Sequence, residues 1–272
     1  MGEQTLSESL RNPLSLFDVK GKSALITGAS GAFGRAVAIP LGALGAKLTL
    51  AGANKEDLED VARECREVGA EVELIYRRPD TLDDAKHMVQ TAVEKHGGLD
   101  QLVVASGFNK AGFIHEQPLE EWEQIMDANV RGAWLMAKAT GSYWIERKQA
   151  GKMLMVSSVR GRFGNVSGYT AYCPSKGATN MLTRVLATEW GKYGTTVNAI
   201  APTVFRSKLT AWMYEEDNEL GQATRARSLS RIPLGRLGEP EDFVGMAIYL
   251  LSPASSFCTG QIMYVDGGFS AG

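Results

Sequence analysis

The feature of this chain that most limits its fold is a regular alternation of short apolar runs with longer segments of helical period. Short β-branched runs that alternate with helix-length segments are typical of parallel βαβ units. We expect strands at Ser23–Thr27, Lys47–Ala51, Glu71–Tyr76, Gln101–Ala105, Lys152–Ser157, Thr195–Ile200 and Gln261–Val265. We expect helices at Phe33–Leu44, Lys55–Glu67, Leu82–His96, Leu119–Ile145, Tyr172–Tyr193 and Pro240–Leu251. The alternation predicts an α/β, doubly wound Rossmann fold, in which a single seven-stranded parallel sheet carries helices on both faces.

The domain organisation follows from how far this alternation continues. A chain of 272 residues has room for one or two domains, but no linker, repeat or low-complexity stretch interrupts the pattern. We therefore predict an N-terminal arm over residues 1–16 and a single domain over residues 17–272. Residues 203–231 depart from the pattern and are expected to form a partly helical insertion over a site.

Composition narrows the class of function. Lys and Arg number 29 and Asp and Glu 31, so the net charge of −2 provides no field that attracts nucleic acid or a membrane surface. Three cysteines and three histidines show no metal-ligand spacing, and so few cysteines argue against a secreted disulfide framework. We find neither a signal sequence nor an apolar run of the roughly 20 residues that a membrane helix requires. These observations predict a cytoplasmic protein with a small-molecule substrate and without metal, nucleic-acid or membrane partners.

The first expected strand leads into a glycine-rich turn, Thr27-Gly28-Ala29-Ser30-Gly31-Ala32-Phe33-Gly34-Arg35, and then into a helix. Glycines at such a turn let the backbone approach a pyrophosphate, which the amides and dipole of the helix N-terminus stabilise. The spacing does not match GxGxxG, and a tight strand-to-helix turn without a ligand is the alternative. Its position at the first βα turn of an alternating chain favours a dinucleotide site.

A second pattern pairs Tyr172 with Lys176, one helical turn later. Because free tyrosine titrates near pH 10, a tyrosine that acts as an acid or base near neutrality needs a nearby cation to stabilise its phenolate. An ordinary surface pair is the alternative. The pair opens a helix that follows a strand ending in Ser157-Ser158, and this position favours a catalytic role.

Together, these two motifs resemble the short-chain dehydrogenase/reductase family from about Leu16 onward. The TGxxxGxG turn of that family matches at Thr27, Gly28 and Gly34, with Ala32 in place of its middle glycine. Its NNAG segment is Val104-Ala105-Ser106-Gly107 here, and its PG segment is Pro202-Thr203. Near the C-terminus, Thr259-Gly260-Gln261 and Val265-Asp266-Gly267-Gly268 match well.

The resemblance implies an NAD(P)-dependent oxidoreductase that interconverts a secondary alcohol and a ketone by hydride transfer. Tyr172 would act as the acid or base, and Lys176 would support it and bind the nicotinamide ribose. Ser158 would position the carbonyl, and Asn129 would order a proton relay. A nucleotide-sensing or scaffold protein of the same fold is the alternative, because several cofactor-facing motifs are altered, but such a protein has no use for the proton-transfer residues. A serine hydrolase is disfavoured because no GxSxG motif stands between an expected strand and an expected helix.

Carried over residue by residue, the resemblance also implies which residues bind the cofactor. They are Gly28, Ser30, Gly31, Phe33, Gly34, Gly52, Ala53, Asn54, Arg78, Ala105, Gly107, Tyr172, Lys176, Pro202, Thr203, Val204 and Ser207. An acidic residue after the second strand usually selects NAD, but Gly52 and Ala53 stand there instead. Because Arg35, Lys55 and Arg78 are candidate neighbours of a 2′-phosphate, we favour NADP over NAD.

The substrate-binding residues are expected around the strand ends and the insertion. The candidates are Arg160, Arg162, Tyr169, Phe205 and Trp212. Arginines beside the site, with Arg206 as a third, would bind a carboxylate or phosphate, as in a sugar acid or another hydroxy or oxo acid. Polyols, cyclic ketones and acyl thioesters remain alternatives. The resemblance also implies a homotetramer or homodimer built on the two long helices.

Overall fold

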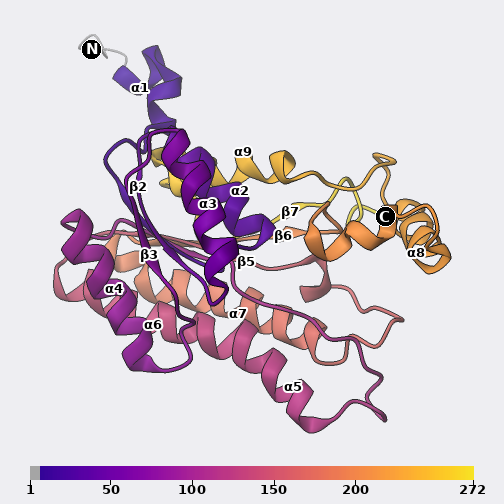
Figure 1. Ribbon diagram of the computed structural model, residues 1–272. Coiled ribbons are helices and arrows are strands. Elements are labelled where there is room, and N and C mark those ends of the chain that lie inside the picture. Colours follow the sequence, from indigo (N-terminus) through magenta and orange to yellow (C-terminus); the bar gives the residue numbers. More distant parts are fainter. Residues whose placement is uncertain (1–6) are drawn as a thin grey trace.

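Parallel strands form one sheet at the centre of the computed structural model, which describes residues 7–272 (Figure 1). The sheet has seven strands in the order β3-β2-β1-β4-β5-β6-β7. Their bounds are β1 Ser23–Thr27, β2 Lys47–Ala51, β3 Val72–Ile75, β4 Gln101–Val104, β5 Lys152–Val156, β6 Thr196–Pro202 and β7 Ile262–Val265. The predicted doubly wound fold is confirmed.

Helices cover both faces of the sheet, which explains why the strands are apolar on both sides (Figure 1). On one face lie α2 (Ala32–Ala43), α3 (Lys55–Glu67) and α9 (Pro240–Leu251). On the other lie α4 (Leu82–His96), α6 (Gly132–Glu146) and α7 (Tyr172–Trp190). Each layer has its own core: Val37, Leu58 and Phe243 pack against one face, and Met88 and Met136 against the other.

The predicted helix Leu119–Ile145 is wrong in one respect, because its middle is not an α-helix. The chain runs from α5 (Leu119–Met126) through a π-helical turn, η2 (Asp127–Arg131), into α6. A π turn inserts one residue into the helical repeat and often marks a functional site. Here it carries Asn129, whose side chain is only 3% exposed.

The segment 203–231 is helical in part, as predicted. It contains the 3-10 turn η5 (Lys208–Tyr214) and the helix α8 (Glu219–Leu229), which lie at the end of the molecule that also holds the C-terminus (Figure 1). Asn218 caps α8 by accepting a hydrogen bond from the Gly221 amide. Three further 3-10 turns are η3 (Val159–Gly161), η4 (Gly191–Tyr193) and η6 (Pro253–Ser255).

The predicted N-terminal arm is partly described. Its first six residues lie outside the described residues, and the rest form a short helix, α1 (Glu8–Arg11), and a 3-10 turn, η1 (Pro13–Phe17). Leu10 and Leu14 are exposed. Within residues 7–272, no helix combines the length and the apolar character needed to cross a membrane.

The strand order brings the loop after β1 and the loop after β4 to neighbouring positions at one edge of the sheet, where both can contact the same ligand. From β1 the chain continues outward to β2 and β3, then crosses back so that β4 lies beside β1. The loops after β1 and β4 therefore diverge from each other at the carboxyl edge of the sheet, which is where open α/β sheets bind ligands.

Candidate active site

The turn between β1 and α2 brings backbone atoms unusually close together. Gly28 has a φ of +67°, and a Cβ atom there would lie 2.5 Å from the Ser106 amide nitrogen. A Cβ atom at Gly34 would lie 2.2 Å from the Gly28 carbonyl oxygen. These two positions therefore require glycine. At Gly31, which precedes the first residue of α2, the corresponding distance to the Gly28 oxygen is 3.3 Å, so that position is less constrained.

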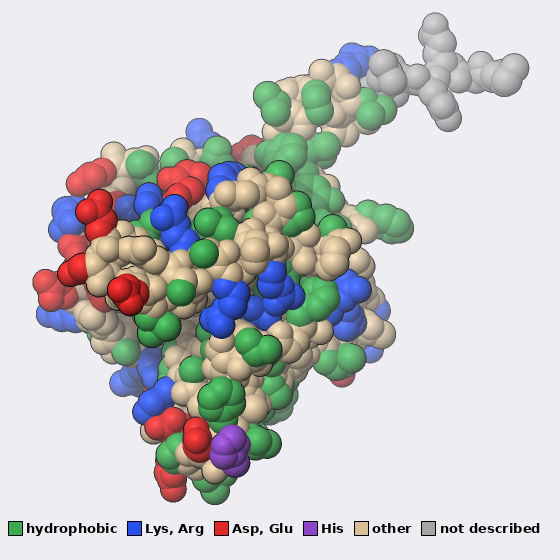
Figure 2. Space-filling view, turned by 90° about the vertical axis from the view of Figure 1, so that its right-hand side faces the viewer, with side chains coloured by type: hydrophobic (Ala, Val, Ile, Leu, Met, Phe, Trp, Pro, Cys, Tyr) green, Lys and Arg blue, Asp and Glu red, His purple; other side chains and the backbone are tan. Residues whose placement is uncertain are grey.

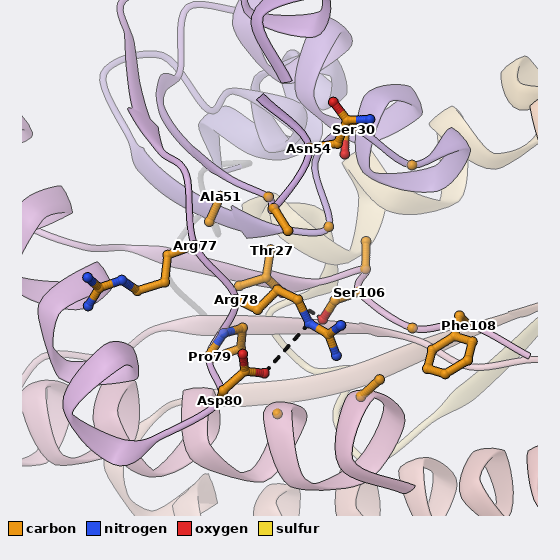
Figure 3. Close-up of a pocket in the computed structure, with 18 of the residues that line it drawn as sticks. Thr27, Ser30, Ala51, Asn54, Arg77, Arg78, Pro79, Asp80, Ser106 and Phe108 are labelled. Carbon is orange, nitrogen blue, oxygen red and sulfur yellow. Dashed lines mark hydrogen bonds and ion pairs between the residues drawn. The ribbon is translucent and has the colours of Figure 1, made fainter. Parts of the chain in front are cut away.

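Next to this turn is a cavity of about 340 Å³, which spans the carboxyl ends of β1, β2, β3 and β4 (Figure 3). Residues predicted to bind the cofactor contribute much of its lining: Gly28, Ser30, Gly31, Gly52, Ala53, Asn54, Arg78, Ala105 and Gly107. Ala32, the departure from the family motif, does not line it. Its lining runs from the glycine turn to the segment after β3 (Figure 3).

Two adjacent arginines after β3 point in different directions. Figure 3 shows the Arg78 side chain extending into the cavity toward Ser106 and Phe108, whereas Arg77 points away. Arg78 Nε lies 3.6 Å from an oxygen of Asp80, and Arg77 is paired with Asp84 at 2.8 Å. Arg78 is thus the arginine available to a ligand in this cavity.

The other two candidate neighbours of a 2′-phosphate lie elsewhere. Arg35 donates two hydrogen bonds to Glu64, at 2.6 and 2.8 Å, and Lys55 lies over the Tyr76 ring. Neither side chain lines the cavity. Local sequence could not reveal the Arg35–Glu64 pair, because it joins α2 to α3.

Tyr172 begins α7 beside the end of β5, where Ser158 lies. Burial raises the pKa of Tyr172 to about 12, although its hydrogen bond with Ser158 acts in the opposite direction. Ser158 is 7% exposed and also accepts a hydrogen bond from the Arg160 amide at 3.1 Å. With its pKa so high, the Tyr172 phenol is protonated at neutral pH.

Lys176 lies one turn along α7, with its Nζ 5.7 Å from the centroid of the Tyr172 ring. The ammonium donates a hydrogen bond to the Val156 carbonyl oxygen at 2.9 Å. Because the residue is only 6% exposed, burial lowers the pKa of Lys176 to about 8. We expected Lys176 to lower the pKa of Tyr172, but burial has the largest effect on the pKa of both residues. The effects that lower the pKa of Tyr172 come from Ser158 and Arg160.

Asn129 links the π turn to both sides of the site. Its Oδ1 accepts from the Phe108 amide at 2.9 Å, and its Nδ2 donates to the Phe108 carbonyl oxygen at 3.0 Å and to Ser175 Oγ at 2.9 Å. A Cβ atom at Gly107 would lie 2.7 Å from Asn129 Oδ1 and 3.5 Å from Lys176 Nζ. Gly107, Asn129 and Lys176 therefore lie next to one another, and Gly107 also lines the cavity.

Comparison with known proteins agrees with this arrangement. A family model described as "Enoyl-(Acyl carrier protein) reductase" matches residues 28–270, and an uncharacterized oxidoreductase of Mycobacterium tuberculosis is 50% identical over the whole of both chains. The chain belongs to the short-chain dehydrogenase/reductase family. It is therefore an oxidoreductase by family.

More distant members of the short-chain dehydrogenase/reductase family carry specific names. A 3-oxoacyl-[acyl-carrier-protein] reductase of Thermotoga maritima is 31% identical, covering 92% of this chain and 98% of its own. A gluconate 5-dehydrogenase of Gluconobacter oxydans is 31% identical over 94% and 97%. A protein of Agrobacterium tumefaciens solved with bound NADP is 27% identical, with a TM-score of 0.83 over 94% of this chain and 99% of that one.

Several predicted cofactor residues of this short-chain dehydrogenase/reductase lie outside the cavity. The Phe33 ring packs on Phe205 and Phe243, at centroid distances of 5.2 and 4.8 Å. Ser207 shares a capping box with Thr210 at the start of η5. Gly34, Tyr172, Lys176, Pro202, Thr203 and Val204 also lie outside the cavity lining.

The candidate substrate residues are dispersed. Phe205 is 5% exposed and is packed into the core, so its side chain is not presented on a lid surface. Trp212 lies in η5 and donates to the Leu209 carbonyl oxygen, and exposed Arg162 lies over Phe163. Tyr169 is nearer the reacting group, because its ring meets that of Tyr172 edge-on at 5.7 Å.

Two loops are tied together at the entrance to the site. The Gly112 amide donates to the Gly168 carbonyl oxygen at 2.7 Å, and Thr170 Oγ1 donates to Gln117 Oε1 at 3.2 Å. A Cβ atom at Gly168, whose φ is +70°, would lie 2.8 Å from the Gly112 carbonyl carbon. We call this contact between the loop after β4 and the loop before α7 the loop clasp.

Sequence reasoning missed several residues that line the cavity. They are Thr27, Ala51, Arg77, Pro79, Asp80, Ser106, Phe108, Asp127, Ala128 and Gly132. Most of them are immediate neighbours of predicted residues at strand ends, so adjacency was an available signal. Asp127, Ala128 and Gly132 carry no such signal, because the π turn brings them to the cavity. Among the described residues, no group of three His, Cys, Asp or Glu side chains could hold a metal ion.

Proposed function

We propose that this protein is an NAD(P)-dependent oxidoreductase that interconverts a secondary alcohol and a ketone, with Tyr172 as the acid or base. The observation that carries the proposal is that Ser158, Tyr172, Lys176 and Asn129 lie close together beside Gly107, which lines the cavity. A protein that only senses nucleotides would need the cavity but not the proton-transfer residues.

The cavity fits a dinucleotide. The Gly28 and Gly34 positions leave room for backbone alone, so the first turn of α2 can approach a pyrophosphate with its free amides. The lining from Gly52 to Arg78 would hold the adenosine half, and Gly107 and Lys176 lie where the nicotinamide half would reach. When bound, the cofactor supplies or accepts the hydride.

The protein's own residues handle the proton. In the direction of reduction, Tyr172 Oη donates its proton to the substrate oxygen as the carbonyl carbon receives the hydride, and Ser158 donates a hydrogen bond to the same oxygen. The raised pKa of Tyr172 keeps this proton in place at neutral pH. Asn129 holds Phe108 and Ser175 and thereby fixes the walls around Lys176.

We propose NADP rather than NAD as the preferred nucleotide. None of Gly52, Ala53 and Asn54, which line the cavity after β2, carries a carboxylate, so a 2′-phosphate meets no repulsion from these three residues. Arg78 provides a cation directed into the same space (Figure 3). The related Agrobacterium tumefaciens protein, which was solved with NADP, supports this preference.

The substrate class is open among the relatives, which are named for a sugar acid and for an acyl thioester. The decisive experiment for the reaction is the Tyr172→Phe variant, assayed with NADPH against a panel of ketones and, in reverse, with NADP⁺ against alcohols. We expect activity to fall at least about a thousandfold, while NADPH binding, followed by fluorescence, stays within about threefold. Full activity in this variant would disprove the assignment of Tyr172.

We also propose a homotetramer or homodimer. An open hollow of about 640 Å³ lies between η2, α6 and α7, and its lining is almost wholly apolar. Trp134, Met181 and Val185 in this hollow are 49%, 55% and 43% exposed. A contiguous apolar surface of this kind is typical of an interface, and the family commonly assembles through the corresponding helices.

A further inference from the structure

Two arginines meet over one phenylalanine ring beside the reacting groups. Arg160 follows the end of β5, two residues after Ser158, and its Cζ lies 5.4 Å from the centroid of the Phe269 ring. Arg231 follows α8, and its Cζ lies 4.2 Å from the same centroid. Phe269 is only 6% exposed and packs edge-on against Phe163. A fixed ring therefore holds both guanidinium groups in place.

Neither of these arginines has an acidic partner. Within residues 7–272, no carboxylate lies within 4.0 Å of Arg160 or Arg231, whereas Arg35 and Arg236 each form a close ion pair. Arg160 Nη1 donates only to the Gly164 carbonyl oxygen, at 2.6 Å. Burial and the charge of Arg231 lower the pKa of Arg160. Two like charges are thus held together without a counter-ion.

Both arginines belong to the end of the molecule that carries α8 and the C-terminus. Figure 2 shows Lys and Arg side chains gathered near the middle of that face, without Asp or Glu side chains between them. A guanidinium presents several donors in a plane and is suited to bind a carboxylate. A half-buried arginine beside an exposed one, without a carboxylate partner, is stabilised when such an anion binds.

The arginine pair is also close to the reacting hydroxyl. The positive charge of Arg160 acts on Tyr172, whose pKa it lowers against the effect of burial. Arg160 also stands two residues after Ser158, and its amide donates to Ser158 Oγ at 3.1 Å, so an anion bound by Arg160 would lie on the side of the site that holds Ser158 and Tyr172. Arg162 and Arg206, which the sequence pairs with Arg160, do not share this place: Arg162 lies over Phe163, and Arg206 lies over Tyr214 with Glu239 3.8 Å away.

We propose that Arg160 and Arg231 together bind the carboxylate of a short hydroxy or oxo acid whose alcohol or ketone carbon faces Tyr172. The inference rests on the proposed oxidoreductase function and names its substrate class. The Phe269 ring positions the two guanidinium groups, so Phe269 acts as a positioning residue.

The test compares substrates that differ only in charge. NADPH-dependent reduction of acetoacetate is measured against reduction of its neutral ethyl ester, with the wild type and with Arg160→Gln and Arg231→Gln. We expect each substitution to lower kcat/KM for acetoacetate by about 10- to 100-fold, chiefly through KM, because it removes hydrogen bonds to a charged group. Activity on the ester should change less than about threefold in Arg231→Gln, and Arg160→Gln, which also removes a charge that acts on Tyr172, should lower activity on the ester less than activity on acetoacetate. Arg147→Ala is the matched control, because Arg147 also lies over an aromatic ring, that of Tyr143, at the end of α6.

A second pair of substrates separates the carboxylate from a distant phosphate. Acetoacetyl-coenzyme A and acetoacetyl-N-acetylcysteamine carry the same ketone, and only the first bears phosphates. We expect their kcat/KM values to agree within about threefold. A strong preference for the coenzyme A thioester that disappears in Arg231→Gln would overturn the short-acid assignment.

A binding measurement does not depend on turnover. Acetoacetate is titrated by calorimetry into the enzyme saturated with NADP⁺, which cannot reduce it. If acetoacetate binding weakens at least about tenfold in Arg160→Gln and Arg231→Gln, but not in Arg147→Ala, the arginine pair is supported. If no ketone is turned over at the same time, only the proposed reaction fails. Turnover of neutral ketones together with equal acetoacetate binding in all variants would reject the arginine pair and leave the reaction intact.

Discussion

At Tyr172 and Lys176, burial has opposite consequences for an acid and a base. It raises the pKa of the phenol to about 12 and lowers that of the amine to about 8. Both residues are thus biased toward their neutral forms in the folded protein. Below about pH 8 the buried ammonium of Lys176 is charged and destabilises the folded protein, and deprotonation removes this destabilisation.

This bias predicts a pH-dependent stability. Between about pH 8 and the ordinary lysine value of 10.5, the unfolded chain binds more protons at Lys176 than the folded chain, so its contribution to the free energy of unfolding rises with pH by about 2 to 3 kcal/mol. Lys176→Met should remove that rise. Urea unfolding of the nucleotide-free protein at several pH values measures it, with the exposed Lys192→Met as control. Parallel curves for wild type and Lys176→Met would contradict the prediction.

Arg78 gives a second prediction at this scale. Arg78→Ala should weaken NADPH binding by about tenfold or more while leaving NADH binding within about threefold, because only NADPH carries the 2′-phosphate. Fluorescence titration of both nucleotides measures the change. Arg77→Ala is the neighbouring control, since Arg77 points away and pairs with Asp84. NADH binding at least tenfold tighter than NADPH binding in the wild type would reverse our choice of nucleotide.

Individual residues differ in how far sequence could place them. The Tyr172–Lys176 pair and the Gly28 turn were predictable, because each depends on a spacing within one element. The packing of Phe205 against Phe33 was not, because it joins residues 172 positions apart in a region that the pattern assigned to a surface insertion. Of the arginine pair, the sequence predicted only Arg160, because nothing in the sequence besides its charge distinguishes Arg231.

Among the elements, η2 combines irregular backbone with a buried polar side chain. Its π turn places Asn129 between the loop after β4 and α7, where it makes three hydrogen bonds, to the amide and carbonyl of Phe108 and to Ser175. These bonds satisfy a buried amide side chain and compensate for the irregular turn. The hydrophobic periodicity of the sequence does not reveal such a turn, because apolar residues continue at helical spacing on both sides of it. For that reason the sequence predicted one continuous helix.

Loss of the Asn129 amide should loosen this connection. Asn129→Ala leaves the Phe108 amide without its acceptor, and we expect a loss of about 1 to 3 kcal/mol in the free energy of unfolding and a clear fall in kcat. Hydrogen exchange at Phe108 should accelerate. Asn129→Asp keeps the acceptor and removes the donors, so it should protect the Phe108 amide better than alanine does. Unchanged exchange in Asn129→Ala would show that the bond does not hold the loop.

The sheet as an element was almost fully predictable. The bounds of β1, β2 and α3 agree with the sequence pattern to the residue, because apolar strands between capped helices are a local signal. The cavity could be predicted only as a position at the sheet edge. Its shape depends on where Arg78 and the π turn come to lie, which is a matter of packing between distant segments.

For the whole molecule, we propose that the apolar hollow between η2, α6 and α7 forms the interface between subunits. Met181→Asp places a charge on that surface, and its burial in an interface would cost several kcal/mol, so we expect dissociation at micromolar concentration. Size-exclusion chromatography with light scattering gives the mass. Val68→Asp, at an exposed apolar position after α3, is the control. A wild-type protein that elutes as a monomer would disprove the proposed oligomer.

The loop clasp also has a consequence for how this protein can diverge. Gly168 fits against Gly112 with no space for a side chain, and Thr170 depends on Gln117. A change of length or of residue in one loop therefore requires a compensating change in the other, because otherwise the contact between them is lost. Among descendants of this sequence, we expect the two loops to change together, as a single inherited unit, while the glycine turn beneath them stays the same.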